Sequence, residues 1–151
     1  MRLTQLTFRL GLTLLVFIIA GCKRDNQCDV PSYPVYFEMN IVSMYPHFVP
    51  DNGFQILTFT HKRYERDLIG YAGLLVEVGM DGHYHAFDLC CPHCLDPKQP
   101  VQIDGFYAVC PTCQEAFDLS YGLAYPTKGV TRQALRRFGT IYQYGILTIR
   151  N

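Results

Sequence analysis

Two short cysteine motifs constrain this chain of 151 residues more than any other feature. The first reads CPHC at residues 91–94, the second reads CPTC at residues 110–113, and 15 residues separate them. Two CxxC steps at such a separation can bring four thiolates around one centre. A Pro after the first Cys stiffens each loop. The spacing therefore predicts a metal site whose ligands are Cys91, Cys94, Cys110 and Cys113. Two local disulfides, or inert buried thiols, are the alternative.

The first residues have the pattern of an export signal. Arg2 and Arg9 are the only charges before an apolar run at residues 10–20, and that run is too short to span a membrane. Residues 19–22 read IAGC and resemble a bacterial lipobox. The segment is therefore interpreted as the signal peptide of a lipoprotein.

The lipobox resemblance implies that residues 1–21 are removed and that Cys22 carries a lipid. Such a lipid would anchor the protein to a membrane of the bacterial cell envelope, on its periplasmic or outer-membrane face. Residues 22–33 are polar and are predicted to be a tether, and residues 34–151 are predicted to form one domain.

Export also bears on the remaining two cysteines, Cys28 and Cys90. In an oxidising compartment they could form a disulfide with each other. Spacing alone does not give connectivity, so this pairing is a hypothesis.

Charge and motif content limit the functions to be considered. The formal net charge is zero, so no basic excess would attract nucleic acid. The sequence contains no Ser–His–Asp order, nucleophile elbow, phosphate loop or dinucleotide fingerprint. We therefore expect that the protein binds no nucleic acid and that it is not an enzyme but at most a redox carrier.

The rest of the chain has short runs rich in β-branched and aromatic residues, without sustained helical periodicity. Turn signals such as the Asp104-Gly105 pair separate these runs. The sequence therefore predicts an all-β fold, a small sandwich or barrel. The predicted strands are residues 35–42, 54–60, 74–78, 84–88, 101–103, 106–109 and 116–119, with one or two more within 141–149. Residues 122–129 are predicted to be a loop, and His83 and His85 are interpreted as residues of a partly exposed edge strand.

The flanks of the cysteine motifs resemble those of Rieske iron–sulfur proteins. Residues 110–122 read CPTCQEAFDLSYG, similar to the second cluster loop of that family, C-P-x-H-G-x-x-F-D/N-L-x-x-G. Residues 86–93 read AFDLCCPH and are similar to its first, C-x-H loop. The resemblance covers residues 70–149 and implies a Rieske-like sandwich or barrel. Its metal-binding subdomain would be rubredoxin-like or zinc-ribbon-like, with the cysteine motifs at residues 90–113.

The ligand set departs from that family at one position, because Cys113 stands where the second His ligand is expected. A Rieske centre holds one iron by two Cys and the other by two His. Here Cys91 and Cys110 could hold one iron, and Cys113 the other. We expect Cys94 as the fourth ligand because its CxxC spacing is symmetric, with His93 as the alternative ligand.

The resemblance implies a 2Fe–2S cluster and electron transfer, with a redox partner that the sequence does not name. Thiolate in place of imidazole lowers a reduction potential. Glu115 and Phe117 replace the Ser and Tyr that donate to the sulfurs in high-potential members. A low potential is therefore expected.

One Zn²⁺ is the alternative cofactor, in a structural interaction module without redox activity. Exported Rieske proteins resemble one another in using twin-arginine signals, and this signal has no Arg-Arg pair. A chain exported unfolded could bind zinc afterwards, so the export route favours the zinc alternative.

Overall fold

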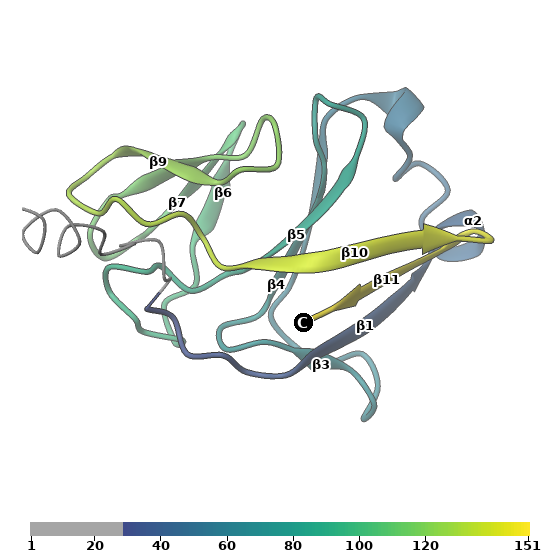
Figure 1. Ribbon diagram of the computed structural model, residues 1–151, viewed down its shortest axis with the longest axis horizontal. Coiled ribbons are helices and arrows are strands. Elements are labelled where there is room, and N and C mark those ends of the chain that lie inside the picture. Colours follow the sequence, from purple (N-terminus) through teal and green to yellow (C-terminus); the bar gives the residue numbers. More distant parts are fainter. Residues whose placement is uncertain (1–28) are drawn as a thin grey trace, which may run out of the picture.

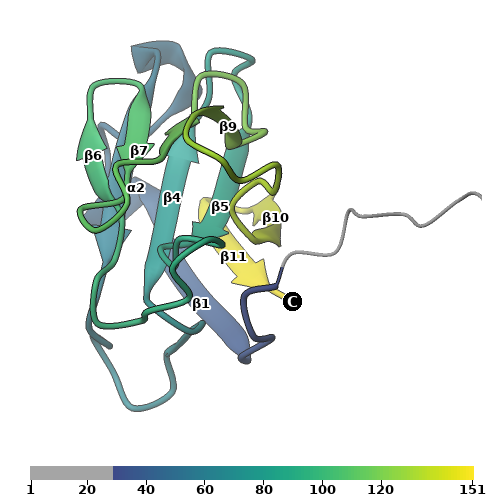
Figure 2. The same cartoon turned by 90° about the vertical axis from the view of Figure 1, so that its left-hand side faces the viewer.

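The computed structural model describes residues 29–151, which form two antiparallel sheets (Figures 1 and 2). The predicted signal peptide, Cys22 and Cys28 lie outside the described residues. The larger sheet, here called the body, has the strand order β2 (Gln55–Phe59), β4 (Leu74–Val78), β5 (Tyr84–Asp88), β10 (Arg137–Gln143), β11 (Ile146–Arg150), β1 (Val35–Asn40) and β3 (Leu68–Ile69). The smaller sheet has the order β6 (Gln102–Asp104), β7 (Tyr107–Val109), β8 (Ala116–Asp118) and β9 (Tyr125–Lys128).

The smaller sheet and the two cysteine motifs lie together at one end of the molecule, and we call residues 89–128 the cysteine lobe. Figure 1 shows the smaller sheet at the left, and the long strands β10, β11 and β1 lie between that end and the short helix α2 (Ile41–Met44) at the right. A 3-10 helix, η1 (Pro50–Asn52), precedes β2. No helix among residues 29–151 has the length and apolarity needed to cross a membrane.

The body curls into a barrel-like shape, and aromatic contacts join strands near the two ends of its strand order. Phe37 on β1 and Phe59 on β2 have ring centroids 4.6 Å apart, although these strands stand near opposite ends of the strand order. The Arg63 guanidinium lies over the Phe37 ring at 3.8 Å, a cation–π contact. The prediction of an all-β small barrel is therefore confirmed.

Strands β4 and β5 are buried along their whole length because both of their faces are covered. Leu74, Val76 and Val78 point into the core inside the body. Leu75 and Phe87 point the other way, into a second core that also contains Phe117 of the cysteine lobe. Side chains alternate across a strand, so one pair of strands serves both cores.

Several secondary-structure predictions are confirmed and others are wrong. Strands β4 and β5 have the predicted bounds, and β6 pairs with β7 as expected. The β6–β7 turn contains Gly105 and Phe106, one residue later than predicted. The strand predicted at 35–42 ends at Asn40, whose side chain accepts a hydrogen bond from Ser43 N and caps α2. The loop predicted at 122–129 contains β9, which pairs with β8.

The last residues of the predicted tether pack against the domain instead of standing free. Val30 is buried, and its carbonyl accepts hydrogen bonds from the Arg136 guanidinium. Asp29 exchanges two hydrogen bonds with Gln133, from its backbone N–H and to its carboxylate. Asp29 and Val30, within the segment predicted to be a tether, therefore contact the domain.

Candidate metal centre

The two cysteine motifs fold into the same local structure. In the first, the Leu95 N–H donates to the Cys91 carbonyl at 3.0 Å, and in the second the Gln114 N–H donates to the Cys110 carbonyl at 2.9 Å. Leu95 and Gln114 also share a left-handed backbone, with φ of 54° and 61°. Each loop thus folds back on its first cysteine and presents two thiols on one side.

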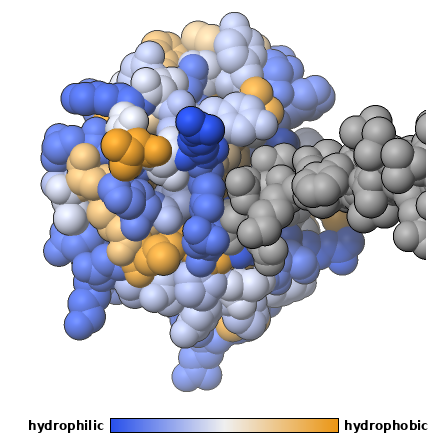
Figure 3. All heavy atoms as spheres, turned by 60° about the vertical axis from the view of Figure 1, so that its left-hand side comes forward, coloured by the Kyte–Doolittle hydropathy of each residue, from blue (hydrophilic) through white to orange (hydrophobic). Residues whose placement is uncertain are grey.

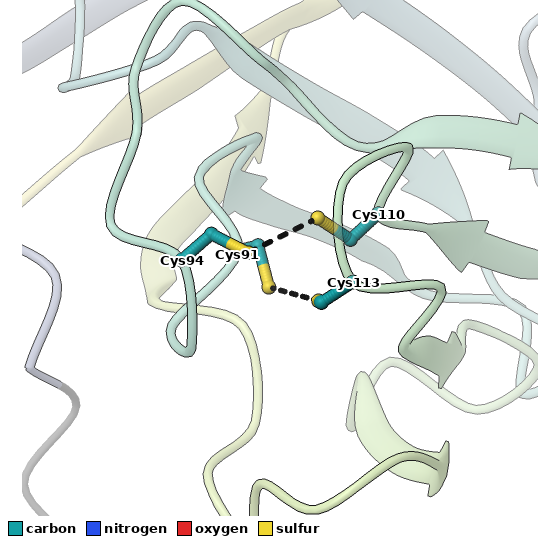
Figure 4. A group of neighbouring side chains, drawn as sticks. All are labelled: Cys91, Cys94, Cys110 and Cys113. Carbon is teal, nitrogen blue, oxygen red and sulfur yellow. Dashed lines mark hydrogen bonds between the residues drawn. The ribbon is translucent and has the colours of Figure 1, made fainter.

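The four cysteines of these loops converge on one point (Figure 4). Cys91 Sγ lies 3.7 Å from Cys113 Sγ, and Cys110 Sγ lies 3.7 Å from Cys94 Sγ. All four sulfur atoms are within 4.8 Å of one another. Sulfur ligands about 2.3 Å from a tetrahedral zinc are about 3.8 Å apart. The arrangement can therefore hold a metal ion with little movement.

The site lies where the second core reaches the surface of the cysteine lobe. Cys91 and Cys110 are buried, whereas Cys94 and Cys113 are partly exposed. Both buried cysteines belong to the core that Phe87 and Phe117 share. The inner half of the site is thus fixed by apolar packing, and its outer half faces solvent.

Burial and neighbouring dipoles act in opposite directions on these thiols. Burial raises the pKa of Cys91 to about 12, although the N–H groups of Cys94 and His93 favour its thiolate. Burial also raises the pKa of Cys94, and nearby thiols add to the effect. For Cys110 burial is outweighed by the N–H groups of Cys113 and Thr112 and by thiol donors, so its pKa is lowered. Metal binding must displace thiol protons, so it is favoured by rising pH.

Asp88 holds the first cysteine loop to the body. Its carboxylate accepts hydrogen bonds from the backbone N–H groups of Tyr71, Ala72 and Cys90, at 2.7, 3.1 and 2.8 Å. Burial raises the pKa of Asp88, and the three N–H groups oppose that shift. Its buried carboxylate therefore joins the 70–72 turn of the body to the start of the loop. The sequence placed Asp88 near the motifs but did not indicate this anchoring role.

The two candidates for the fourth ligand lie in different groups. Cys94 lies with the other three thiols, whereas His93 belongs to a second group with Cys113 and Glu115. His93 Nδ1 is 3.1 Å from Glu115 Oε1. The structure thus brings the symmetric CxxC set together and places His93 at its edge.

Glu115 is the buried residue of that second group, and sequence analysis considered it only as a replacement for a residue that donates to the sulfurs in high-potential Rieske proteins. Its Oε1 accepts hydrogen bonds from Val130 N and Thr131 N, both at 2.8 Å. It thereby joins the second cysteine loop to the segment after β9. The available signal was an acidic residue only two positions after the last cysteine of a CxxC motif.

The other singled-out residues lie apart from the four thiols. Cys90 is buried, with its Sγ 3.6 Å from the Cys91 carbonyl oxygen, and its predicted partner Cys28 is outside the described residues. His85 is buried on an interior strand, so the edge-strand interpretation is wrong for it. Its ring nitrogens contact Asp81 at 2.9 Å and Arg137 at 2.8 Å, in a separate polar cluster.

These features define the class of protein at a general level, an all-β domain with a four-cysteine group capable of binding metal. No family model matches the chain, and no curated protein matches it. Among solved structures the chain is similar to the Sphingomonas yanoikuyae B1 ferredoxin, at 14% identity and a TM-score of 0.41. That match covers 66% of this chain and 87% of the ferredoxin.

Proposed function

We propose that this protein is a lipid-anchored metal protein of the bacterial cell envelope, in which Cys91, Cys94, Cys110 and Cys113 hold one Zn²⁺. The single observation that carries the proposal is the convergence of four sulfur atoms within 4.8 Å. The lipobox-like sequence before Cys22 supports the anchor.

The geometry favours a single ion over a two-iron cluster. The closest sulfur pairs join the two loops, Cys91 with Cys113 and Cys110 with Cys94, each at 3.7 Å. In a 2Fe–2S cluster the ligands of the two irons lie on opposite sides of the cluster. Two sulfur atoms bound to different irons would therefore be farther apart than two sulfur atoms bound to one tetrahedral ion. Since all six separations are within 4.8 Å, one tetrahedral ion fits with less rearrangement.

Zinc suits this site because it has four protein ligands and no open position. Closed tetrathiolate zinc sites are structural. Here the ion would cross-link the loop after β5 to the β7–β8 loop, and so hold the two cysteine loops of the lobe together. The role of the ion is then to order a surface of the lobe for an interaction partner.

Electron transfer with an iron centre, a single iron or a low-potential 2Fe–2S cluster, is the second candidate. It is favoured by the exposure of the outer half of the site, where Cys94 and Cys113 are partly exposed. Leu95 next to Cys94 is 38% exposed, and Val130 is 78% exposed. Figure 3 shows hydrophobic residues in small patches among hydrophilic ones on this side of the molecule. A redox partner could approach the centre here.

Metal analysis and a visible absorption spectrum of the full chain, purified from envelope membranes, test the proposal. The expected result is a colourless protein whose tetrathiolate site contains zinc and loses it in the Cys110→Ser variant. Bound iron with visible absorption would instead support electron transfer, and inorganic sulfide found together with the iron would indicate a cluster. Absence of any bound metal would refute both. Release of the protein by detergent but not by salt tests the anchor, and a Cys22→Ala variant should stay out of the membrane fraction.

A further inference from the structure

We propose that the cysteine lobe binds a second divalent metal ion, held by His93, Cys113 and Glu115, with Cys113 Sγ bridging it to the tetrathiolate ion. The inference rests on the proposed function, because the two sites share Cys113. It assigns His93 and Glu115 a role that the four-thiol site does not need.

The three donor atoms are already assembled. One ligand atom from each residue lies within 4.8 Å of the other two. His93 Nδ1 and Glu115 Oε1 are 3.1 Å apart. Two ligands bound at about 2.0–2.1 Å to one tetrahedral zinc are about 3.4 Å apart. The observed separation therefore fits two ligands of one ion as well as it fits a hydrogen bond.

The Glu115 carboxylate is bonded on one side only. Glu115 is 1% exposed, and its Oε1 accepts hydrogen bonds from Val130 N and Thr131 N and lies 3.1 Å from His93 Nδ1. Its Oε2 is buried and has no hydrogen-bond partner among residues 29–151. A buried carboxylate oxygen without a partner is costly, and a cation bound by both carboxylate oxygens would remove that cost.

Glu115 is also held firmly in place. Gly129 packs so closely on it that a Cβ at this glycine would overlap the Glu115 side chain. Gly129 has φ of 118°, a conformation that favours glycine. The segment after β9 therefore fixes the carboxylate beside His93 through both packing and hydrogen bonds, as a preorganised ligand would require.

Charge favours a second cation next to the first. Four thiolates and one divalent ion have a combined charge of −2 (4 × −1 + 2), and the Glu115 carboxylate adds to it. A thiolate bound to one zinc keeps lone pairs that can bind another. Nitrogen, sulfur and oxygen donors together suit zinc. The His93 side chain is 46% exposed, so an ion can reach the site and a water can complete its coordination.

The test is the number of ions bound by the full chain. After removal of metal under reducing conditions, the protein is titrated with Zn²⁺ and, separately, with Co²⁺, whose thiolate charge-transfer and ligand-field absorption reports on the donor set. Wild type is compared with His93→Ala, Glu115→Gln and Cys91→Ser. His61→Ala, at an exposed histidine between β2 and β3, is the matched control.

We expect two equivalents in wild type and in His61→Ala, and one equivalent in both His93→Ala and Glu115→Gln. The remaining equivalent should keep the Co²⁺ spectrum of a tetrathiolate site. X-ray absorption of the zinc form should show a zinc–zinc vector and mixed sulfur and nitrogen/oxygen ligation. If Glu115→Gln does not fold, His93→Ala alone carries the comparison.

One equivalent in wild type, unchanged in His93→Ala and with sulfur ligation only, would overturn the second site and leave the first intact. Two equivalents that persist in His93→Ala would also overturn it, because the second ion must then bind elsewhere. No bound ion in wild type would overturn the proposed function as well, so the two failures are distinguishable.

Discussion

The body and the cysteine lobe are both antiparallel sheets, yet they are stabilised differently. In the body, every residue of β4 and β5 is buried. In the lobe, all three residues of β6 are exposed, and β7 and β8 each bury one side chain, Ala108 and Phe117. A three-residue strand with one buried side chain gains little from apolar burial. The lobe contributes buried side chains to the second core, but its strands bury little of their own, so its order should depend more than that of the body on what its cysteines bind.

The largest effect is expected when the metal site is disrupted. Cys110→Ser removes a buried ligand, and structural zinc sites in small peptides have apparent binding free energies of about 10–16 kcal/mol. Amide exchange should accelerate across residues 101–128 and change little in β4, β5 and β11. Exchange measured by mass spectrometry checks this, with Thr112→Ala in the same loop as a control that retains all four thiols. Equal protection of the lobe in Cys110→Ser and wild type would refute the dependence on metal.

The next largest effect is expected in the body. Phe37 is fully buried and joins strands near the two ends of the body's strand order. Phe37→Ala should destabilise the protein by about 3–5 kcal/mol, since a large core side chain is lost. Urea unfolding followed by circular dichroism measures the change. Tyr36→Ala, at the partly exposed neighbour on the same strand, is the matched control and should cost much less.

A pH-dependent effect is expected at Glu77, which lies where the two regions meet. It is fully buried on β4 opposite His85 of β5, and the backbone N–H of Gly122 gives its carboxylate only weak support. Burial raises the pKa of Glu77 from 4.5 to about 8, and Asp81 and Asp118 add to this while Arg137 opposes it.

Between these two pH values the folded state keeps a proton on Glu77 that the unfolded chain has released. The contribution of Glu77 to the free energy of unfolding is therefore fully present below pH 4.5 and is lost as the pH rises to about 8. Glu77→Gln should flatten the decline and stabilise the protein at the upper end by a few kcal/mol. Urea unfolding at several pH values measures both, with Glu65→Gln at an exposed position as control. An unchanged slope in Glu77→Gln would assign the pH dependence to other groups.

The smallest effect is expected at the left-handed residue of a cysteine loop. Leu95 has φ of 54°, which costs a non-glycine residue about 1 kcal/mol. Leu95→Gly should therefore stabilise the lobe by up to that amount and slow the removal of metal by a chelator. Leu95→Ala removes the side chain but keeps the backbone cost, so it should not show the gain. Equal behaviour of the two variants would mean that the loop is not strained at this position.

Prediction from sequence worked best where the signal is local. The short apolar and aromatic runs and the turn residues around β4 and β5 predicted the bounds of both strands correctly, and Gly105 placed the β6–β7 hairpin to within one residue. It failed at β9, which contains Pro126 and has no apolar alternation, because that strand forms only by pairing with β8. It also failed for His85, since the strand that covers it, β10, is remote in sequence.

The sequence by itself determined the all-β fold and the location of the four-thiol group, because both follow from short-range spacing. Two CxxC loops of like sequence adopt like backbones, and strands alternate regardless of their partners. The sequence left His93 open as an alternative to Cys94, and only the tertiary structure placed His93 beside Glu115 and away from the four-thiol group. The tertiary structure also decided that Glu115 is buried under residues 129–131. These arrangements depend on contacts between distant segments, which no local pattern records.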